Sequence, residues 1–277
     1  MKKIKYVILF IFVLACCGCG YKYASITRTI RHSGFNVAGN SFKCSSIFDK
    51  KDETINDKVR FYIGNYIITE NGNIYETSLS KVYSNDMNCK RPDFDKKVYA
   101  IFDLSIIKAE DNKYYYVGGS EDVPSYSEVT TADEDYSLYD VLLKDKSVIK
   151  VSTINAKEGL YYVLKSDGNI YQYRVLKGDN KVSYLDSSIL LYDKNDYDSD
   201  IIDFNYNGSS STTFIRTDNH IFRMKITNSE KCYKYVDISC NYEMKEDDNL
   251  TKVRDRILAY NGSTLITTYG SIFNVNN

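Results

Sequence analysis

One short phrase recurs along the chain at a nearly fixed spacing, and this spacing restricts the folds that the sequence can adopt. In each copy an isoleucine follows a pair of turn-forming residues, and Ile170, Ile221 and Ile272 are 51 residues apart twice in succession. Ile74 lies 96 residues before Ile170, close to two such periods. Self-similarity at a period of about 50 residues is typical of repeat architectures, in which each copy is one supersecondary unit.

Each copy is predicted to be a β-hairpin. Its first half is apolar, and its second half alternates, with Tyr171 and Tyr173 on one face and Gln172 and Arg174 on the other. Alternation with a period of two is the signal of a half-buried strand. Asn-Gly and Asp-Gly pairs favour two-residue hairpin turns, because the turn positions require a positive φ. The four turns are therefore expected at Gly72, Gly168, Asn219 and Gly270.

Further apolar segments precede and follow the hairpins, which gives about four strands per period, as in a propeller blade. A degenerate copy with Asp111 and Asn112 at its turn fills the long interval between the first two clear copies. The sequence thus predicts an all-β, propeller-like fold of about five four-stranded blades, with the repeats spanning residues 56–277. A β-sandwich or an irregular β-meander is the alternative.

The N-terminus has the pattern of a bacterial secretory signal. Three lysines stand among the first five residues, and an apolar run over residues 6–15 follows that is too short to span a bilayer. Residues 13–16, V-L-A-C, resemble the lipobox of bacterial lipoproteins. In that family the cysteine thiol is diacylglycerated and the peptide bond before it is cut. The resemblance implies that residues 1–15 are a removed signal peptide and that Cys16 carries lipid.

The lipobox resemblance also implies a location, on the extracytoplasmic side of a bacterial cell membrane and held there by the lipid. Cys17 and Cys19 match the lipobox less well than Cys16 does. Residues 16–33 are then a membrane-proximal tether, and residues 34–277 form the ectodomain. The alternative is cleavage by ordinary signal peptidase, which would release a soluble protein.

The final hairpin has no fourth strand after it, and an unpaired strand edge invites aggregation. We therefore expect residues 34–48 to supply a closing strand that completes the last blade. Such a strand would join the two ends of the repeat array.

Four cysteines of the expected ectodomain are candidates for disulfide bonds, because exported proteins meet oxidising conditions. A bond between Cys44 and Cys89 would tie the N-terminal segment to the first blade. Free buried thiols are the alternative. The four candidates are Cys44, Cys89, Cys232 and Cys240.

Metal and catalytic motifs are weak. Asp196, Asp198 and Asp200 have the alternate spacing of a calcium loop, but Ile201 stands where an EF-hand needs glycine. A solvated loop between blades is the alternative, and no metal site is assigned. His220 follows a turn pair and is interpreted as a turn residue, so no Ser-His-Asp triad is expected. No cofactor motif is found, and we expect no cofactor.

Charge and motifs leave two classes of function. The net charge is −1 with no basic block, which gives no reason to expect a nucleic-acid partner. We expect a membrane-anchored binding or scaffold module for an envelope protein or glycan. The alternative is an envelope carbohydrate-active enzyme similar to five-bladed glycosidases, which would need a carboxylate pair near the centre of the ring. No motif marks such a pair, so no catalytic residue is assigned.

Overall fold

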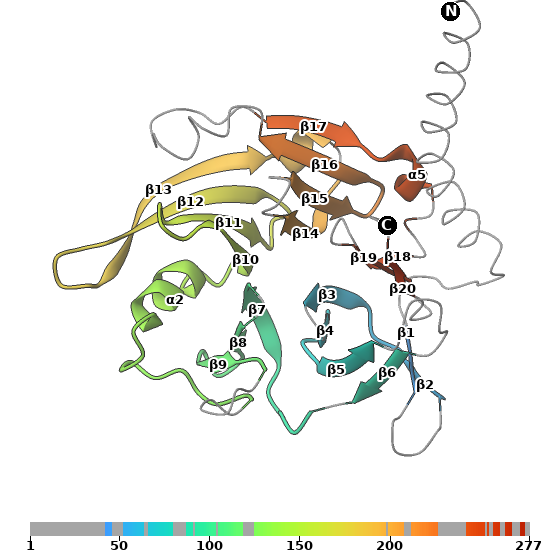
Figure 1. Cartoon of the computed structure of the whole chain (residues 1–277), viewed down its shortest axis with the longest axis horizontal. Helices are drawn as coiled ribbons and strands as arrows, with labels where there is room; N and C mark the ends of the chain where they lie inside the picture. Colours follow the sequence, from blue (N-terminus) through green and yellow to red (C-terminus); the bar gives the residue numbers. More distant parts are fainter. Residues whose placement is uncertain are drawn as a thin grey trace, which may run out of the picture.

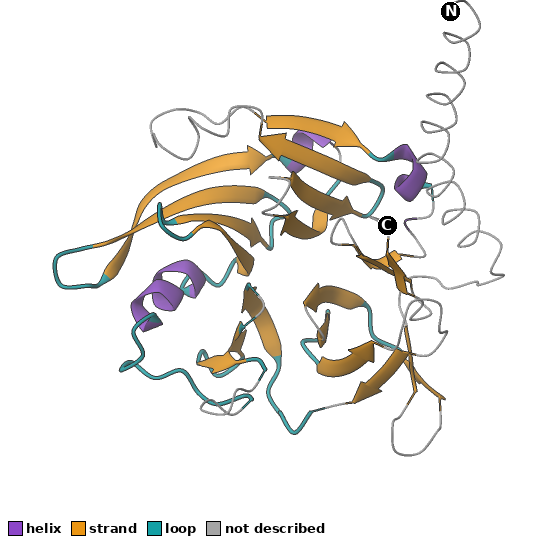
Figure 2. Cartoon of the chain, viewed as in Figure 1, coloured by secondary structure: helices purple, strands orange, loops and turns teal. Residues whose placement is uncertain are grey.

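β-strands predominate in the computed structural model, and three short helices connect some of them (Figures 1 and 2). The structure describes residues 42–45, 52–63, 66–79, 87–90, 92–103, 105–118, 125–197, 199–207, 212–226, 242–252, 254, 257–260, 264–267 and 272–274. The all-β prediction is confirmed. No helix in these ranges is long and apolar enough to cross a membrane.

The strands form five successive antiparallel meanders, which we call units 1 to 5. Unit 1 contains β3 (Val59–Ile63), β4 (Tyr66–Thr69), β5 (Ile74–Leu79) and β6 (Met87–Lys90). Unit 2 contains β7 (Val98–Phe102), β8 (Ile106–Ala109) and β9 (Tyr114–Tyr116), followed by α2 (Tyr136–Leu143). Unit 3 contains β10 (Val148–Asn155), β11 (Leu160–Lys165), β12 (Ile170–Lys177) and β13 (Ser183–Tyr192). The helix α3 (Lys194–Tyr197) leads to unit 4.

Unit 4 contains β14 (Ile201–Asn207), β15 (Thr212–Thr217), β16 (Ile221–Ile226) and β17 (Tyr242–Glu246), followed by α5 (Asp248–Thr251). Unit 5 contains β18 (Ile257–Tyr260), β19 (Thr264–Thr267) and β20 (Ile272–Asn274). Units 1, 3 and 4 have the expected four strands. Units 2 and 5 have three strands among the described residues, and β7 pairs in parallel with β10, which joins units 2 and 3 in one seven-stranded sheet.

The first strands of the units lie close to one another (Figure 1). β3 contacts β14 and β18, and β10 contacts β7 and β14. Unit 1 therefore lies beside unit 5, although the two are at opposite ends of the sequence. The five units are arranged around a common middle, with the later strands farther out.

One hydrophobic core runs through units 1 to 4. It includes Phe61 of unit 1, Ile101 of unit 2, Tyr162 of unit 3 and Phe204 of unit 4, all buried. A second cluster packs α2 against units 2 and 3, with Leu142 fully buried. Burial of apolar surface between successive units, which contributes about 25 cal/mol per Å², is what holds these meanders together.

Two of the four predicted turns, at Gly72 and Gly168, are hairpin turns that are one residue longer than predicted. Gly72 and Gly168 have φ of 76° and 84°, and each ends a three-residue loop closed by a hydrogen bond from its own N–H, to the carbonyls of Thr69 and Lys165. This is a type I turn followed by a left-handed residue, the other common use of a glycine in hairpins. Asn112, with φ of 63°, has the same position in unit 2.

The two remaining predicted turns differ from these. Asn219 lies in a two-residue turn in which the Thr217 N–H donates to the His220 carbonyl, and its φ is not positive. The Thr217 hydroxyl oxygen accepts from the His220 N–H at 2.9 Å, which stabilises the turn without a left-handed residue. Gly270 lies outside the described residues.

The recurring glycines also join one unit to the next. The Gly72 carbonyl accepts a hydrogen bond from the N–H of Val98, the first residue of β7, at 2.8 Å. The Gly168 carbonyl accepts from the N–H of Ile201, the first residue of β14, at 3.3 Å. A Cβ on Gly72 would meet the Val98 carbonyl oxygen at 2.6 Å, so this junction has no room for a side chain. The repeat therefore specifies the contact between units as well as the hairpin.

The expected closing strand is wrong where it can be checked. Within residues 34–48 the structure describes β1 (Phe42–Ser45), which pairs with β2 (Asp52–Ile55) and with β6 of unit 1, not with unit 5. The outer edge of β6 is closer along the sequence, and the β1–β2 hairpin covers it. The β1–β2 hairpin thus protects the outer edge of unit 1 from pairing with other chains.

Candidate functional site

The outermost strand of unit 3 is the first candidate for a binding site. β13 has ten residues and forms one edge of the seven-stranded sheet, with β12 as its only partner among the described strands. The β12–β13 hairpin projects from the body of the protein (Figure 1). Large apolar side chains are exposed along it, with exposed fractions of 59% for Val182, 48% for Tyr184, 45% for Leu185, 38% for Ile189 and 44% for Leu190.

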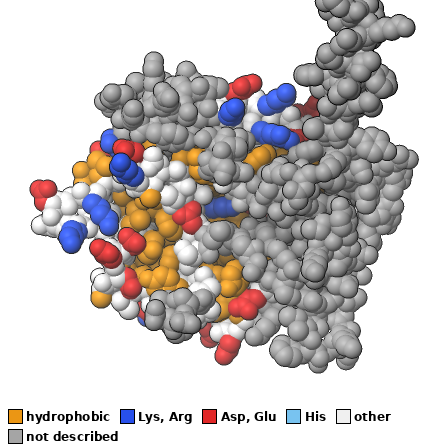
Figure 3. Space-filling model, in the orientation of Figure 1, with side chains coloured by type: hydrophobic (Ala, Val, Ile, Leu, Met, Phe, Trp, Pro, Cys, Tyr) orange, Lys and Arg blue, Asp and Glu red, His pale blue; other side chains and the backbone are white. Residues whose placement is uncertain are grey.

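These apolar side chains lie on both faces of the hairpin. Leu185 and Leu190 are paired with Val175 and Tyr171, which belong to the cluster around α2, whereas Tyr184 and Ile189 are paired with Leu176 and Gln172. Cross-strand partners share a face of a sheet. The edge of β13 is thus flanked above and below by apolar side chains. Figure 3 shows hydrophobic side chains at the surface where Figure 1 places β13.

β13 has few of the charges that protect natural edge strands, although two bulges interrupt it. Its one charged residue is Asp186, which is paired with Arg174 on β12 at 3.4 Å. Two register shifts leave Asp186 and Leu191 as extra residues, so the regular stretch between them is Ser187–Leu190 in this register. Charges and bulges are the devices that prevent an edge from pairing. A short, largely uncharged stretch of β13 is therefore available to another strand.

A polar pocket of about 360 Å³ between α3 and the β15–β16 turn is the second candidate. Each of the described side chains that line it is polar or charged. The lining residues are Lys194, Asn195, Ser199, Asp200, Asp218 and Asn219.

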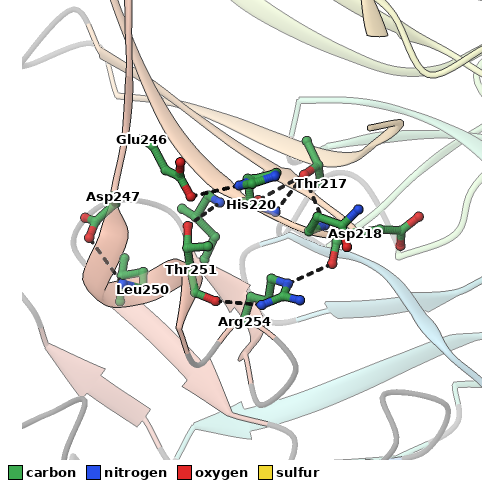
Figure 4. Close-up of polar contacts among 10 residues, drawn as sticks. Thr217, Asp218, His220, Glu246, Asp247, Leu250, Thr251 and Arg254 are labelled. Carbon is green, nitrogen blue, oxygen red and sulfur yellow. Dashed lines mark hydrogen bonds and ion pairs between the residues drawn. The ribbon is translucent and has the colours of Figure 1, made fainter. Parts of the chain in front are cut away.

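His220 lies directly beside this pocket and has an acidic partner (Figure 4). Its Nδ1 is 2.8 Å from Glu246 Oε1 at the end of β17. The hydrogen bond from His220 lowers the pKa of Glu246 below its ordinary value. His220 is a turn residue as predicted, since it joins the turn to β16, but the sequence did not reveal its partner, 26 residues away. No serine or cysteine is brought to this pair by any contact among the described residues.

The first strands carry a buried charged cluster near the middle of the molecule. Lys150 Nζ of β10 is 2.6 Å from Asp203 Oδ1 of β14, and the two side chains are only 4% and 2% exposed. Lys150 also lies over the rings of Phe61 and Phe204 at 5.6 and 5.2 Å. Asp103, after β7, accepts hydrogen bonds from the N–H and the hydroxyl of Thr153.

These contacts bear on the glycosidase alternative. A glycosidase presents two carboxyl groups to its substrate, about 5 to 10 Å apart. Asp203 is buried and paired with Lys150, and Asp103 is occupied by Ser152 and Thr153. Both carboxylates therefore serve contacts within the protein, and the geometry gives that alternative no support.

The other predicted site residues are placed as follows. Cys16, Cys232, Cys240 and Asp198 lie outside the described residues. Cys44 and Cys89 are on the neighbouring strands β1 and β6. The pairing of Ser45 with Asn88 offsets the two cysteines by two residues in the strand register. Strand spacing and rise then separate their Cα atoms by about 8 Å, beyond the usual range for a disulfide. Their proximity is as expected, and their bonding stays a prediction.

The calcium candidate does not assemble in the described part of the loop. Asp196 is exposed on α3, and the Asp200 carboxylate pairs with Lys194 Nζ at 3.1 Å. No group of three or more His, Cys, Asp or Glu side chains in the described ranges could hold a metal ion.

The sequence predicts an apolar segment after the third hairpin but does not identify it as an exposed edge. The available signal is the composition of β13, which has one charge in ten residues and ends in the apolar run Ile189–Tyr192. An edge strand is normally charged, so this composition suits a strand that is to be covered.

No protein-family model matches the sequence, and no curated protein matches it.

Proposed function

We propose that the protein is a lipid-anchored binding module on the extracytoplasmic side of a bacterial membrane, and that it holds a partner protein by its β13 edge. The observation that carries the proposal is the exposed apolar edge strand on a projecting hairpin. The anchor rests on the V-L-A-C sequence that ends in Cys16.

In this proposal the five units are blades of a propeller-like ring that acts as a rigid base for the hairpin. Two features support the ring. The first strands contact one another, including those of units 1 and 5, and the turns of units 1 and 3 hydrogen-bond to the strand that opens the next unit. A rigid base lowers the entropy that the hairpin loses when it binds.

The chemistry of the edge selects an extended protein segment as the partner. An edge strand presents unpaired backbone N–H and C=O groups, which another extended backbone satisfies with alternating hydrogen bonds. Side chains of a strand paired with Ser187–Leu190 would then pack beside Leu190 on one face and beside Ile189 on the other. Leu185 and Tyr184, beyond the Asp186 bulge, continue these two faces and would contact the end of the incoming strand. A glycan or a lipid chain has no matching ladder of backbone groups.

The test uses the full chain in detergent and random dodecapeptides displayed on phage. We expect the selected peptides to be uncharged, with β-branched or aromatic residues in alternation, and to lose binding to a Leu185→Lys/Leu190→Lys variant. Both side chains are substantially exposed, so this variant should fold normally. The matched control is Asp179→Lys/Asn180→Lys, in the exposed loop of the same hairpin. Peptides that bind the Leu185→Lys/Leu190→Lys variant as well as the wild type would refute the proposal.

A further inference from the structure

The polar pocket between α3 and the β15–β16 turn has walls that are fixed before any ligand arrives. On the α3 side, the Lys194 N–H donates to Asn169 Oδ1 at 3.0 Å. The buried Tyr192 hydroxyl donates to the Ser199 carbonyl at 2.9 Å, and the Tyr192 and Tyr197 rings stack with centroids 4.7 Å apart. These contacts attach the segment that carries the pocket residues to the core of unit 3.

The opposite wall is the β15–β16 turn, which is held from both ends. The Thr217 hydroxyl oxygen accepts from the N–H groups of Asn219 and His220, at 3.3 and 2.9 Å. Arg254 Nε donates to the Asp218 carbonyl at 3.1 Å from beyond α5 (Figure 4). The Asp218 side chain itself points away from the Arg254 contact in that view. A preformed cavity with convergent polar groups is the usual form of a small-molecule site.

The pocket has hydrogen-bonding capacity that the protein does not use. The Asp218 carboxylate has no hydrogen bond or ion pair among the described residues. An exposed carboxylate that makes no contact within the protein is free to accept hydrogen bonds from a ligand.

The lining excludes several ligand classes. The described side chains that line the pocket are all polar or charged, which disfavours a lipid tail or an aromatic ring as the main contact. Lys194 is neutralised by Asp200, and Asp218 adds a negative charge, which disfavours an anion. Metal binding is unsupported, since the described residues contain no suitable cluster.

We propose that this pocket binds one or two units of a neutral saccharide. Sugar hydroxyls donate and accept at once, and the lining offers the Asp218 carboxylate as an acceptor and the Asn219 amide, which does both. The Asn195 amide already donates one hydrogen bond to Asp193 Oδ1 at 2.7 Å, which leaves its second N–H and its oxygen for a ligand. The pocket volume lies at the lower end of the range for ligand sites, which suits one or two sugar rings. This inference is independent of the β13 edge, because the pocket uses a different surface.

The test is saturation-transfer NMR on the full chain in detergent, with a panel of neutral hexoses and N-acetylhexosamines and with propylammonium as the cationic alternative. At least one sugar should bind saturably at millimolar concentration. An Asp218→Ala/Asn219→Ala variant should weaken that binding about tenfold or more, because it removes hydrogen bonds to the ligand.

The matched control is Asp179→Ala/Asn180→Ala, an exposed Asp-Asn pair at the tip of the β12–β13 hairpin, which should leave sugar binding unchanged. The inference is overturned if no sugar of the panel binds, if only propylammonium binds, or if the two double variants bind sugar alike. None of these outcomes would affect peptide binding at β13, so the two proposals can fail separately.

Discussion

Neutralising Asp203 should destabilise the protein far more than the small change in side-chain structure suggests. Asp203→Asn keeps the shape of the side chain but leaves the buried ammonium of Lys150 without its counter-charge at 2.6 Å. Removing one partner of a buried pair costs about 3 to 5 kcal/mol, a third or more of the stability of a typical domain. Arg216, the cross-strand neighbour of Asp203, would lose a favourable interaction as well, since the nearby Asp203 carboxylate raises its pKa against the lowering effect of burial.

A double-mutant cycle separates the pair from its surroundings. Lys150→Met should cost less than Asp203→Asn, since it leaves Asp203 with Asn205 and Arg216 as neighbours. The double variant should then be more stable than the sum of the single effects predicts, by about 2 kcal/mol of coupling. The assay is urea unfolding of the full chain, followed by far-UV circular dichroism.

The control is the exposed pair of Arg174 and Asp186, 3.4 Å apart. Asp186→Asn should cost less than about 1 kcal/mol, because solvent screens exposed pairs. Additive effects at Lys150 and Asp203, or an Asp203→Asn loss no larger than that of Asp186→Asn, would refute the view that a buried ion pair holds the first strands together.

Three further predictions follow from the turns, the His220 pair and the anchor. Gly72→Ala should cost about 3 kcal/mol, and Gly118→Ala about 1 kcal/mol in thermal unfolding. Gly118 is also at positive φ, but a Cβ there would meet only the Tyr66 hydroxyl, at an ordinary 3.6 Å; equal losses would refute the junction role of Gly72. The lowered pKa of Glu246 means that its stabilising interaction is present above about pH 4 and is lost as the pH falls. His220→Ala should therefore destabilise more at about pH 5 than at about pH 3, and a loss independent of pH would contradict this. Cys16→Ser should abolish fatty-acid labelling and leave uncleaved precursor; unchanged labelling would assign the lipid to another cysteine.

The hairpins could be predicted from sequence because their determinants are local. Turn residues and alternation act within about ten positions, and the strands after Gly72 and Gly168 begin where the pattern places them. The length of the turn was not determined, since Asp-Gly suits both a two-residue turn and a type I turn with a left-handed third residue. The hydrogen bonds of Gly72 and Gly168 to the next unit depend on tertiary packing, which the local pattern does not contain.

The partners of strands far apart in sequence could not be predicted. β1 was expected to pair at the end of the chain, but it pairs with β6, whose free edge the hydrophobic pattern does not distinguish from that of β20. The exposure of Leu185 and Leu190 likewise depends on β13 pairing with one strand only, β12, among the described strands. The Glu246 partner of His220 comes from a different strand, β17. Each of these features depends on which strands become neighbours in the folded protein, and the local sequence pattern does not specify those neighbours.

The central claim is that β13 pairs edge-on with a strand of another protein. It is tested most directly by introducing a photoreactive phenylalanine analogue at one position at a time in the full-length chain, produced in a bacterial host. Strand addition predicts cross-links to the same partner from both faces, that is from Leu185 and Leu190 and also from Tyr184 and Ile189, and none from Asp179 in the loop. Cross-links from one face only, or equal cross-linking from Asp179, would contradict pairing at the edge.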